Sequence, residues 1–477
     1  MNDATQMFES INPATGQVVW AGEACSSSTV LEIVQRAKAS QPTWEAAGLP
    51  YRKEIIQRFA QLVKENSEEA ATIIAEENGK PIWEARTEVN SLVNKVQAVF
   101  DAYDERAKEK TKEVNGRTSV TRYRAHGIMA VLGPFNFPMS MPNSHVMPAL
   151  LAGNTVIFKP SERVPKSAEY YVNLWYQAGV PTDVLLIAYG DKDVGACLID
   201  QPEVNGVLMI GSRYAGVEIQ KKLATASDKI CALEMGGNSP LVIWDYEDVR
   251  LAVHIAIQSA YISSGQRCSA ARRLIVNKAI ANEYISALKS AVERIVVGKQ
   301  FDTDPVPFMG PLIDHKAFER FIFDYNALLA KGAEIVVAAD PIPALGDNFV
   351  RPALVDVTNI IADDAEIFGP LLQLKVVDSL QQAIVEANAT QFGLAAGIVT
   401  TSKETYEEFY SGTKSGIINW NQPLTGATTA APFGGAKASG NYRPAGFLSV
   451  DYCSYPCASI EDAAPAVPPK LSPGLSY

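Results

Sequence analysis

Apolar residues recur at three- and four-residue spacings through much of the first hundred residues. This spacing predicts helices over residues 30–40, 52–66, 70–78 and 83–106, the last of them after a Gly-Lys-Pro turn. Before them, a turn followed by an apolar run at residues 11–19 predicts an early strand or hairpin. We therefore expect the chain to begin with a small β element and a group of packed surface helices.

From residue 127 onward, short apolar runs alternate with segments of helical length. The first series of runs lies at residues 127–134, 154–160, 184–190 and 206–211. The second series lies at residues 240–244, 273–276, 334–337, 372–377 and 396–399. A parallel, doubly wound sheet requires this alternation, because helices cover its strands on both faces. The pattern predicts an α/β fold that binds ligands beyond the carboxyl ends of its strands.

The glycine pair Gly236-Gly237 separates the two series and is the expected domain boundary. We expect one domain over residues 1–116 and 129–236 and a second domain over residues 237–438. Each domain then contains one series of strands with its own covering helices.

Two further segments alternate polar and apolar side chains. Residues 117–128 and 447–460 predict an exposed ribbon, in which the two segments pair with each other or with the sheet of another subunit. The Pro- and Ser-rich residues 463–477 predict an extended tail.

Composition places the chain among ordinary globular proteins. Its 477 residues are 47% hydrophobic and 20% charged, enough for two or three domains. The formal net charge of −11, without a long Lys/Arg run, argues against nucleic acid or an anionic membrane as the main partner. Residues 1–25 lack a signal-peptide pattern, and no window has the length and apolarity of a membrane span. We expect a cytoplasmic protein that acts on small molecules.

One of the six cysteines, Cys268, stands where a loop-like Ser-Ser-Gly-Gln-Arg segment leads toward the apolar run at residues 274–276. A thiol at such a point can be an exposed nucleophile, provided that a positive field stabilises its thiolate. Arg267, Arg272 and Arg273 are candidates to supply part of that field. A small buried hydrophobe is the alternative reading of a lone cysteine. The choice depends on whether other segments supply a base, an oxyanion site and an electron acceptor.

Two polar residues stand in apolar or rigid surroundings. Glu234 lies between apolar neighbours just before the glycine pair, and a carboxylate in such a setting has the raised pKa that suits a general base. Asn136 lies between aromatic and proline residues, where its amide could donate to a developing oxyanion together with the backbone N–H of Cys268. An ordinary turn is the alternative for each of them.

Two strand ends have features of a nucleotide site. Residues 211–216 begin and end with glycine and open a helix whose N–H groups could face a pyrophosphate, although the usual Gly-x-Gly-x-x-Gly spacing is absent. Lys159 and Glu162 follow another strand and could hydrogen-bond ribose hydroxyls. The alternatives are a plain strand-to-helix turn at the first site and a helix N-cap formed by Ser161 at the second.

These segments belong to a larger ordered set. Eight motifs occur along the chain: Gly-Pro-Phe-Asn-Phe-Pro at 133–138, Leu-Ala-Gly-Asn-Thr at 151–155, Lys-Pro-Ser-Glu at 159–162, Gly-Ser through Gly at 211–216, Leu-Glu-Met-Gly-Gly at 233–237, Gly-Gln-Arg-Cys at 265–268, Glu-Ile-Phe-Gly-Pro at 366–370 and Pro-Phe-Gly-Gly at 432–435. Through them the chain resembles the NAD(P)-dependent aldehyde dehydrogenase superfamily over essentially its whole length. The resemblance implies a Rossmann-type NAD-binding domain, an α/β catalytic domain and a small β oligomerisation ribbon that joins a homodimer or homotetramer.

The resemblance also implies catalytic roles. Cys268 would be the nucleophile that attacks an aldehyde, Glu234 the general base and Asn136 the oxyanion donor. No metal is implied, and the four histidines show no metal-ligand spacing.

The cofactor residues follow from the same resemblance. Lys159 and Glu162 would bind the adenosine ribose, and the carboxylate of Glu162 favours NAD because it would repel the 2′-phosphate of NADP. Glu366 and Phe368 would hold the nicotinamide ribose. The segment near the pyrophosphate would comprise Gly211, Ser212, Arg213, Tyr214, Ala215 and Gly216.

A narrower likeness concerns the substrate. Residues 142–149, 266–273, 419–427 and 439–456 resemble the part of the family that oxidises an ω-semialdehyde with two carboxylates away from the aldehyde. Cationic groups must then line the pocket. The candidates are Arg267 and Arg443, followed by the weaker Thr425 and His145. A structural salt bridge is an equal reading for each arginine, and a non-catalytic binding protein or a thioesterase is an alternative function.

Overall fold

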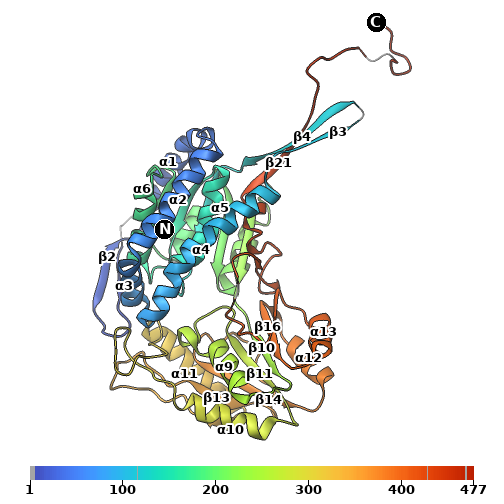
Figure 1. Ribbon diagram of the computed structural model, residues 1–477. Coiled ribbons are helices and arrows are strands. Elements are labelled where there is room, and N and C mark those ends of the chain that lie inside the picture. Colours follow the sequence, from blue (N-terminus) through green and yellow to red (C-terminus); the bar gives the residue numbers. More distant parts are fainter. Residues whose placement is uncertain (1–5, 115, 427, 468–469) are drawn as a thin grey trace.

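The computed structural model describes residues 6–114, 116–426, 428–467 and 470–477. It contains two α/β parts and a narrow β ribbon that projects from one of them (Figure 1). Parts of three predicted segments lie outside the described residues. They are residues 1–5 and 115 of the first predicted domain, residue 427 of the second and residues 468–469 of the predicted tail. Within the described part, no helix is long and apolar enough to cross a membrane.

The first α/β part is built on a five-stranded, fully parallel sheet. In spatial order its strands are β7 (Leu185–Ile187), β6 (Thr155–Lys159), β5 (Ile128–Leu132), β8 (Val204–Gly211) and β9 (Ile230–Met235). From β5 the chain proceeds outward through β6 to β7, and then returns to β8 on the other side of β5. The strand order therefore reverses beside β5, which is where open α/β sheets bind ligands.

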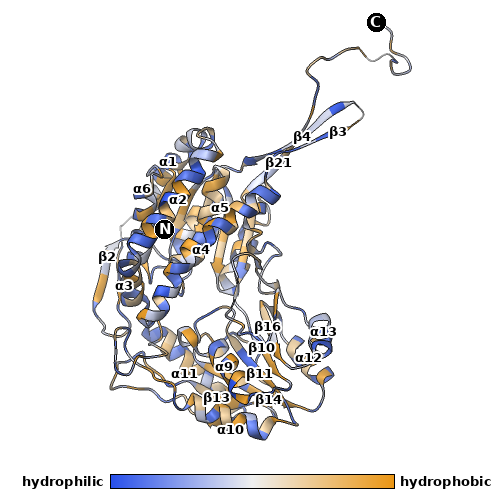
Figure 2. Ribbon diagram, viewed as in Figure 1, coloured by the Kyte–Doolittle hydropathy of each residue, from blue (hydrophilic) through white to orange (hydrophobic). Residues whose placement is uncertain are grey.

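Helices cover both faces of this sheet. They are α1 (Ser27–Ala46), α2 (Leu49–Glu65), α3 (Ser67–Asn78), α4 (Ile82–Arg106), α5 (Ser140–Ala152), α6 (Pro165–Ala178), α7 (Lys192–Asp200) and α8 (Arg213–Leu223). Successive residues of β5 point to opposite faces: Met129 packs in a core with α2, α4 and α6, whereas Ala130 packs in a core with α1 and α7. Figure 2 shows the resulting apolar strands between helices of mixed polarity.

The second α/β part has a seven-stranded sheet in which only the β12–β13 pair is antiparallel. Its order is β12 (Glu334–Val337), β13 (Ala353–Asp356), β14 (Leu371–Val377), β11 (Ala271–Asn277), β10 (Ser239–Ile243), β16 (Ala395–Val399) and β17 (Ile417–Trp420). Its helices are α9 (Val249–Ala260), η1 (Ile262–Gly265), α10 (Ala281–Val292), α11 (His315–Ala330), α12 (Leu380–Asn388) and α13 (Lys403–Gly412). The central position of β11 places the segment that precedes it at the middle of the sheet edge.

The projecting ribbon is a three-stranded antiparallel sheet of β21 (Ser454–Glu461), β4 (Arg117–Ala125) and β3 (Lys110–Val114). The pairing of β21 with β4 is one of the two arrangements that the sequence left open. Shorter elements complete the fold: β1 (Met7–Ile11), β2 (Val18–Glu23), β15 (Phe392–Gly393), β18 (Pro432–Phe433), β19 (Ala436–Lys437), β20 (Ala445–Gly446) and η2 (Ser449–Tyr452).

The sequence pattern missed three strands of the two sheets. These are β9, β13 and β17, at residues 230–235, 353–356 and 417–420. Each interrupts its apolar run with a polar residue or is only four residues long, so the run alone did not identify it. The segment at residues 11–19 forms the turn of the β1–β2 hairpin, with β-strands on both sides of it.

Candidate active site

The loop before Cys268 has an uncommon backbone conformation. Ser263, Ser264 and Gly265 have φ angles of 55°, 52° and 67°, in the left-handed region that non-glycine residues seldom adopt. A side chain at Gly265 would bring its Cβ to 2.2 Å from the carbonyl oxygen of Gly369. The loop therefore follows a tightly packed path that ends at Cys268, three residues before β11.

The Cys268 thiol lies in a field opposite to the one that we expected. Burial raises its pKa to about 12, and the carboxylates of Glu234 and Glu366 add to that rise, while Arg267 opposes it. Arg267 favours the thiolate, in the direction that we predicted, but its effect on the thiol pKa is smaller than those of burial and of the two carboxylates. The protonated thiol is the stable form at neutral pH, so its proton must leave as the sulfur attacks.

The three arginines near Cys268 are bound elsewhere. Arg267 forms an ion pair with Glu84, at 2.9 Å between Nη2 and Oε1, and Arg273 forms one with Glu386 at 2.7 Å. Arg272 is fully buried and donates to the carbonyl oxygens of Gly369 at 3.1 Å and Arg267 at 3.0 Å. These contacts explain why the cations do not offset the effect of burial on the thiol.

Glu234 lies at the end of β9, next to the glycine pair that begins the second α/β part. Its carboxylate is buried and has no hydrogen-bond partner among the described residues. Burial raises its pKa to about 8, and the nearby backbone N–H of Ala445 and the Lys95 ammonium partly offset this rise. A carboxyl group with this pKa can both accept and release a proton near neutrality, as a general base must.

Asn136 lies in the loop between β5 and α5, at the point where the strand order reverses. It is 7% exposed, and its Nδ2 donates to the carbonyl oxygen of Gln266 at 2.8 Å. Because Nδ2 carries two hydrogens, a second N–H is left for an oxyanion.

The three candidate catalytic residues are brought together by these contacts. Asn136 bonds to the residue two positions before Cys268, and Glu234 is near enough to Cys268 to raise the pKa of its thiol. A Cβ at Gly237 would lie 3.0 Å from the carbonyl oxygen of Cys268. The site therefore lies where the first sheet meets the edge of the second.

Lys159 and Glu162 converge at the end of β6. The Nζ of Lys159 lies 3.8 Å from Oε2 of Glu162, and Lys159 is 8% exposed whereas the Glu162 side chain is 46% exposed. Ser161 is not a helix N-cap, because α6 begins only at Pro165 and the Ser161 hydroxyl accepts from the backbone N–H of Arg163. The pair therefore offers a donor and an acceptor to a ligand rather than a cap to a helix.

The segment at residues 211–216 joins β8 to α8, as predicted. Ser212 is the N-cap, and its hydroxyl accepts from the backbone N–H of Ala215 at 3.2 Å, while Arg213 and Tyr214 are exposed. Gly216 has a packing role, since a Cβ there would lie 2.3 Å from Sδ of Met235 on β9. The first turn of α8 thus presents N–H groups to solvent beside the switch point of the sheet, which suits a phosphate ligand.

Glu366 and Phe368 lie on the other side of the site. Oε1 of Glu366 accepts from the backbone N–H of Gly237 at 3.0 Å, and burial raises the Glu366 pKa to about 7. A Cβ at Gly236 would lie 1.8 Å from Oε2 of Glu366, so only glycine leaves room for this carboxylate. The Phe368 ring contacts that of Phe135 edge-on, with centroids 5.8 Å apart. These features fit the ribose and ring of a dinucleotide.

The four candidates for the substrate carboxylates occupy different surroundings. His145 is fully buried and bonds through Nδ1 to Tyr452, and burial lowers its pKa to about 3, so it is neutral. Thr425 donates to the carbonyl oxygen of Gln258. Arg267 is paired with Glu84, whereas Arg443 is exposed and makes no ion pair within the described part of the chain. Of the two arginines, Arg443 is the one whose guanidinium has no ion-pair partner among the described residues.

Sequence reasoning missed a group of buried charges on and beside α4. Lys80, Glu84 and Glu88 are buried, Lys95 is half-buried, and all four are linked to residues of the site, although we expected only a packed surface helix there. The four-residue spacing of Glu84 and Glu88 was visible, but that spacing is equally typical of a solvated helix face.

Comparisons with known proteins agree with this geometry. The model of the aldehyde dehydrogenase family matches residues 1–455. The N-succinylglutamate 5-semialdehyde dehydrogenase of Novosphingobium aromaticivorans is 44% identical over 456 residues, or 94% of this chain and 95% of that protein. The enzyme of the same name from Burkholderia thailandensis is 43% identical over 480 residues, or 100% of this chain and 98% of that protein.

A solved structure has the same fold. The indole-3-acetaldehyde dehydrogenase of P. syringae, in complex with NAD+, superposes with a TM-score of 0.90 at 26% identity, covering 96% of this chain and 93% of that one. The family model and the relatives span nearly the whole sequence, and the fold and the order of the motifs agree with them. This chain therefore belongs to the aldehyde dehydrogenase family.

Proposed function

We propose that this chain oxidises N-succinyl-L-glutamate 5-semialdehyde to N-succinyl-L-glutamate with NAD, a step of the arginine succinyltransferase route. The gathering of Cys268, Glu234 and Asn136 where the two sheets meet carries the reaction class. The two relatives of that name, at 43% and 44% identity over nearly the whole chain, support the substrate. The alternative is another ω-semialdehyde, such as succinate or glutamate semialdehyde.

The reaction begins at Cys268. Its proton passes to water as the sulfur bonds to the aldehyde carbon, because a thiol with a pKa of about 12 holds that proton at neutral pH until the attack. The aldehyde oxygen then gains negative charge. The free N–H of the Asn136 amide and the backbone N–H of Cys268 are the donors that stabilise this alkoxide.

The residues at the two strand ends fit NAD. Lys159 and Glu162 would hold the adenosine ribose, the start of α8 the pyrophosphate and Glu366 the nicotinamide ribose. When bound, NAD supplies the hydride acceptor that protein side chains lack. The exposed carboxylate of Glu162 favours NAD over NADP, since a 2′-phosphate would be repelled there.

Oxidation leaves an acyl group on Cys268 as a thioester, which water must remove. Glu234 takes a proton from that water, because a carboxyl group with a pKa near 8 is in part deprotonated at neutral pH and basic enough to act. Attack by the resulting hydroxide breaks the carbon–sulfur bond. The products are the carboxylate and the free thiol.

Substrate recognition and assembly are further parts of the proposal. Arg443 is the candidate partner for a substrate carboxylate, because its exposed guanidinium is unpaired within the described residues. The β21–β4–β3 ribbon leaves strand edges through which a second copy can pair, which supports a homodimer or homotetramer. We place the enzyme in the cytoplasm, in keeping with its free cysteines.

The test is NADH formation by the purified enzyme with N-succinylglutamate, succinate and glutamate semialdehydes. We expect the highest kcat/KM with the first substrate, and a Cys268→Ala variant without activity on any of them. Equal kcat/KM values for all three would contradict the substrate. Full activity of Cys268→Ala would remove Cys268 from the mechanism.

A further inference from the structure

Helix α4 carries two carboxylates that the reaction does not use. Glu84 and Glu88 are one turn apart, and their exposed fractions are 0% and 2%. Burial of a carboxylate is costly unless cations and donors surround it. The partners of these two residues therefore show what the buried charges hold in place.

Glu84 connects α4 to the loop of the nucleophile. Its Oε1 accepts from Nη2 of Arg267 at 2.9 Å and from the hydroxyl of Ser263, and the Nε of Arg267 also donates to that hydroxyl at 2.8 Å. Burial acts to raise the pKa of Glu84, but Arg267 and Lys80 hold it below its ordinary value. Glu84 is therefore an anion that neutralises Arg267, the residue next to Cys268.

The loop needs such support because of its backbone. Ser263 and Ser264 are non-glycine residues in the left-handed region, and that conformation persists only where the surroundings impose it. Ser264 is held by a bond from its hydroxyl to the carbonyl oxygen of Gly310, at 2.8 Å. The hydroxyl of Ser263 is held by Glu84 and Arg267, and its carbonyl oxygen accepts from Nε2 of Gln266 at 3.4 Å.

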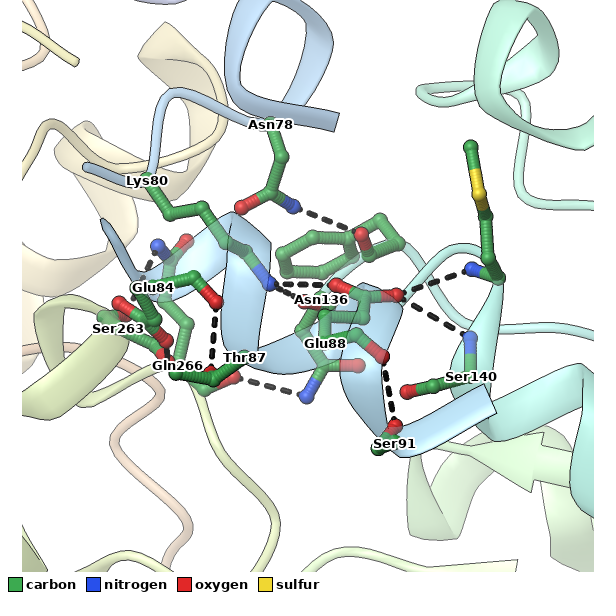
Figure 3. Close-up of polar contacts among 12 residues, drawn as sticks. Asn78, Lys80, Glu84, Thr87, Glu88, Ser91, Asn136, Ser140, Ser263 and Gln266 are labelled. Carbon is green, nitrogen blue, oxygen red and sulfur yellow. Dashed lines mark hydrogen bonds and ion pairs between the residues drawn. The ribbon is translucent and has the colours of Figure 1, made fainter. Parts of the chain in front are cut away.

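Glu88 connects α4 to the loop that carries Asn136, the oxyanion donor. It accepts from Lys80 at 2.9 Å and from the backbone N–H groups of Met139 and Ser140 at 3.1 and 3.2 Å. Lys80 also donates to the carbonyl oxygen of Asn136 at 2.7 Å. Figure 3 shows Lys80 and Glu88 together with Asn136 on one side and Glu84 with Ser263 on the other.

Two contacts join these halves. The ring of Phe137 contacts both cations: its centroid is 4.1 Å from Nζ of Lys80 and 4.9 Å from Cζ of Arg267. The Asn136 amide bonds to the carbonyl oxygen of Gln266. The nucleophile loop and the oxyanion loop are thus fixed to one helix and to each other.

We infer that Glu84 and Arg267 are positioning residues that act on Cys268 through Ser263, and that Arg267 does not bind the carboxylates of the substrate. Its guanidinium is 12% exposed and its charge is matched by a fully buried anion. The inference rests on the proposed function only for the choice of aldehyde. The effect on the thiol is independent of any substrate.

The first experiment measures alkylation of Cys268 by iodoacetamide as a function of pH, followed by mass spectrometry of the Cys268 peptide. Charged groups that act on this thiol are Glu234, Glu366, Arg267 and Arg272. In Glu84→Gln the Arg267 charge is no longer matched, so we expect the midpoint of alkylation to fall by about one pH unit or more. In Arg267→Met it should rise.

The second experiment measures steady-state kinetics with N-succinylglutamate 5-semialdehyde and with the uncharged aldehyde hexanal. Displacement of the thiol should lower kcat of Glu84→Gln and of Arg267→Met by about 10- to 100-fold, and by a similar factor for both aldehydes. The matched control is Glu68→Gln, which removes an exposed ion pair between Glu68 and Arg86 of α4 and should change neither kinetics nor alkylation.

Three results would overturn the inference. One is wild-type alkylation and kcat in folded Glu84→Gln. Another is an Arg267→Met variant whose KM rises for the succinylated substrate alone, with unchanged kinetics on hexanal. The third concerns the double variant Glu84→Gln/Arg267→Met, which removes both charges together and is used if a single variant does not fold. Wild-type kcat in this double variant would overturn the inference. Failure of the wild type to oxidise the succinylated substrate would contradict the proposed function but leave the alkylation result valid.

Discussion

The environment of Glu234 and its catalytic role oppose each other. Burial disfavours the charged carboxylate, whereas a general base acts in its charged form. Burial raises its pKa to about 8, and no hydrogen bond of normal length from the described residues stabilises the anion. A partner would stabilise the anion and weaken it as a base. The same reasoning holds for Cys268, whose proton must leave a thiol that burial stabilises in its neutral form.

Glu234→Gln should therefore separate the two halves of the reaction. We expect one rapid turnover of NADH, because thiol attack and oxidation come first, followed by a steady rate at least about 100-fold lower than that of the wild type. In the wild type the hydrolytic rate should increase as pH rises through about 8, where Glu234 loses its proton. Stopped-flow measurement of NADH across pH tests both, and a full steady rate in the variant would contradict the assignment.

The same substitution should raise stability at high pH. The folded-state pKa of Glu234, near 8, is above the ordinary value of 4.5. Below about pH 4.5 the group is protonated in the folded and the unfolded protein, and the folded state keeps its full stability. This stability is lost as pH rises through 8, because the buried carboxylate must then carry a charge. Glutamine carries no such penalty. We expect Glu234→Gln to increase the free energy of unfolding by about 2–4 kcal/mol at pH 9 and much less at pH 5. Denaturant titration at the two pH values measures the difference, and equal gains at both would contradict the pKa.

At the scale of elements, the cofactor site depends on how closely α8 approaches β9. Gly216 sets that distance, since a Cβ would lie 2.3 Å from Sδ of Met235 and 3.1 Å from Cε of Met209. The helix start that would face a pyrophosphate is therefore positioned by packing on its inner side. The sequence shows a glycine here, but not the reason for it.

Gly216→Ala should push α8 away from the sheet. We expect a loss of about 1–3 kcal/mol in unfolding free energy and a rise in the KM for NAD. Lys221→Ala, exposed in the last turn of the same helix, is the control and should leave the KM for NAD close to that of the wild type. A normal KM for NAD in Gly216→Ala would show that α8 does not bind the cofactor.

At the scale of the whole molecule, the β21–β4–β3 ribbon projects away from both α/β parts (Figure 1). Its strand β21 is an edge strand, and Ile460 on it is 61% exposed. An exposed, apolar edge of this kind is a pairing surface for another chain unless something covers it. We expect a second copy of this chain to do so.

Ile460→Glu should then weaken assembly without unfolding the protein, because the residue is exposed in the single chain. We expect the variant to dissociate to monomers at a protein concentration at least about tenfold higher than the wild type does. Sedimentation velocity over a dilution series measures this. Lys112→Glu on β3 would test whether the opposite edge of the ribbon takes part in assembly. Thr118→Glu is unsuitable for this purpose, because Thr118 faces Glu461 on the neighbouring strand.

The sequence by itself determined the kind of fold and the chemistry of the site. Alternating apolar runs predicted the parallel sheets, because a strand buried on both faces needs apolar residues at nearly every position. The order of motifs around Asn136, Glu234 and Cys268 indicated the family, which the comparisons confirm. These properties depend on which residues are present and in what order.

Only the tertiary structure decided the state of those residues. Arg267 favours the thiolate of Cys268, as predicted, but burial and the carboxylates of Glu234 and Glu366 raise the thiol pKa by more. Glu84 and Glu386 already neutralise two of the three arginines, and no sequence pattern shows these pairings. Segments nearly two hundred positions apart, at Glu84 and Arg267, meet only in the folded chain. The loop that looked from its sequence like a nucleophile with its own cation is instead a strained turn, fixed to α4 by a buried anion.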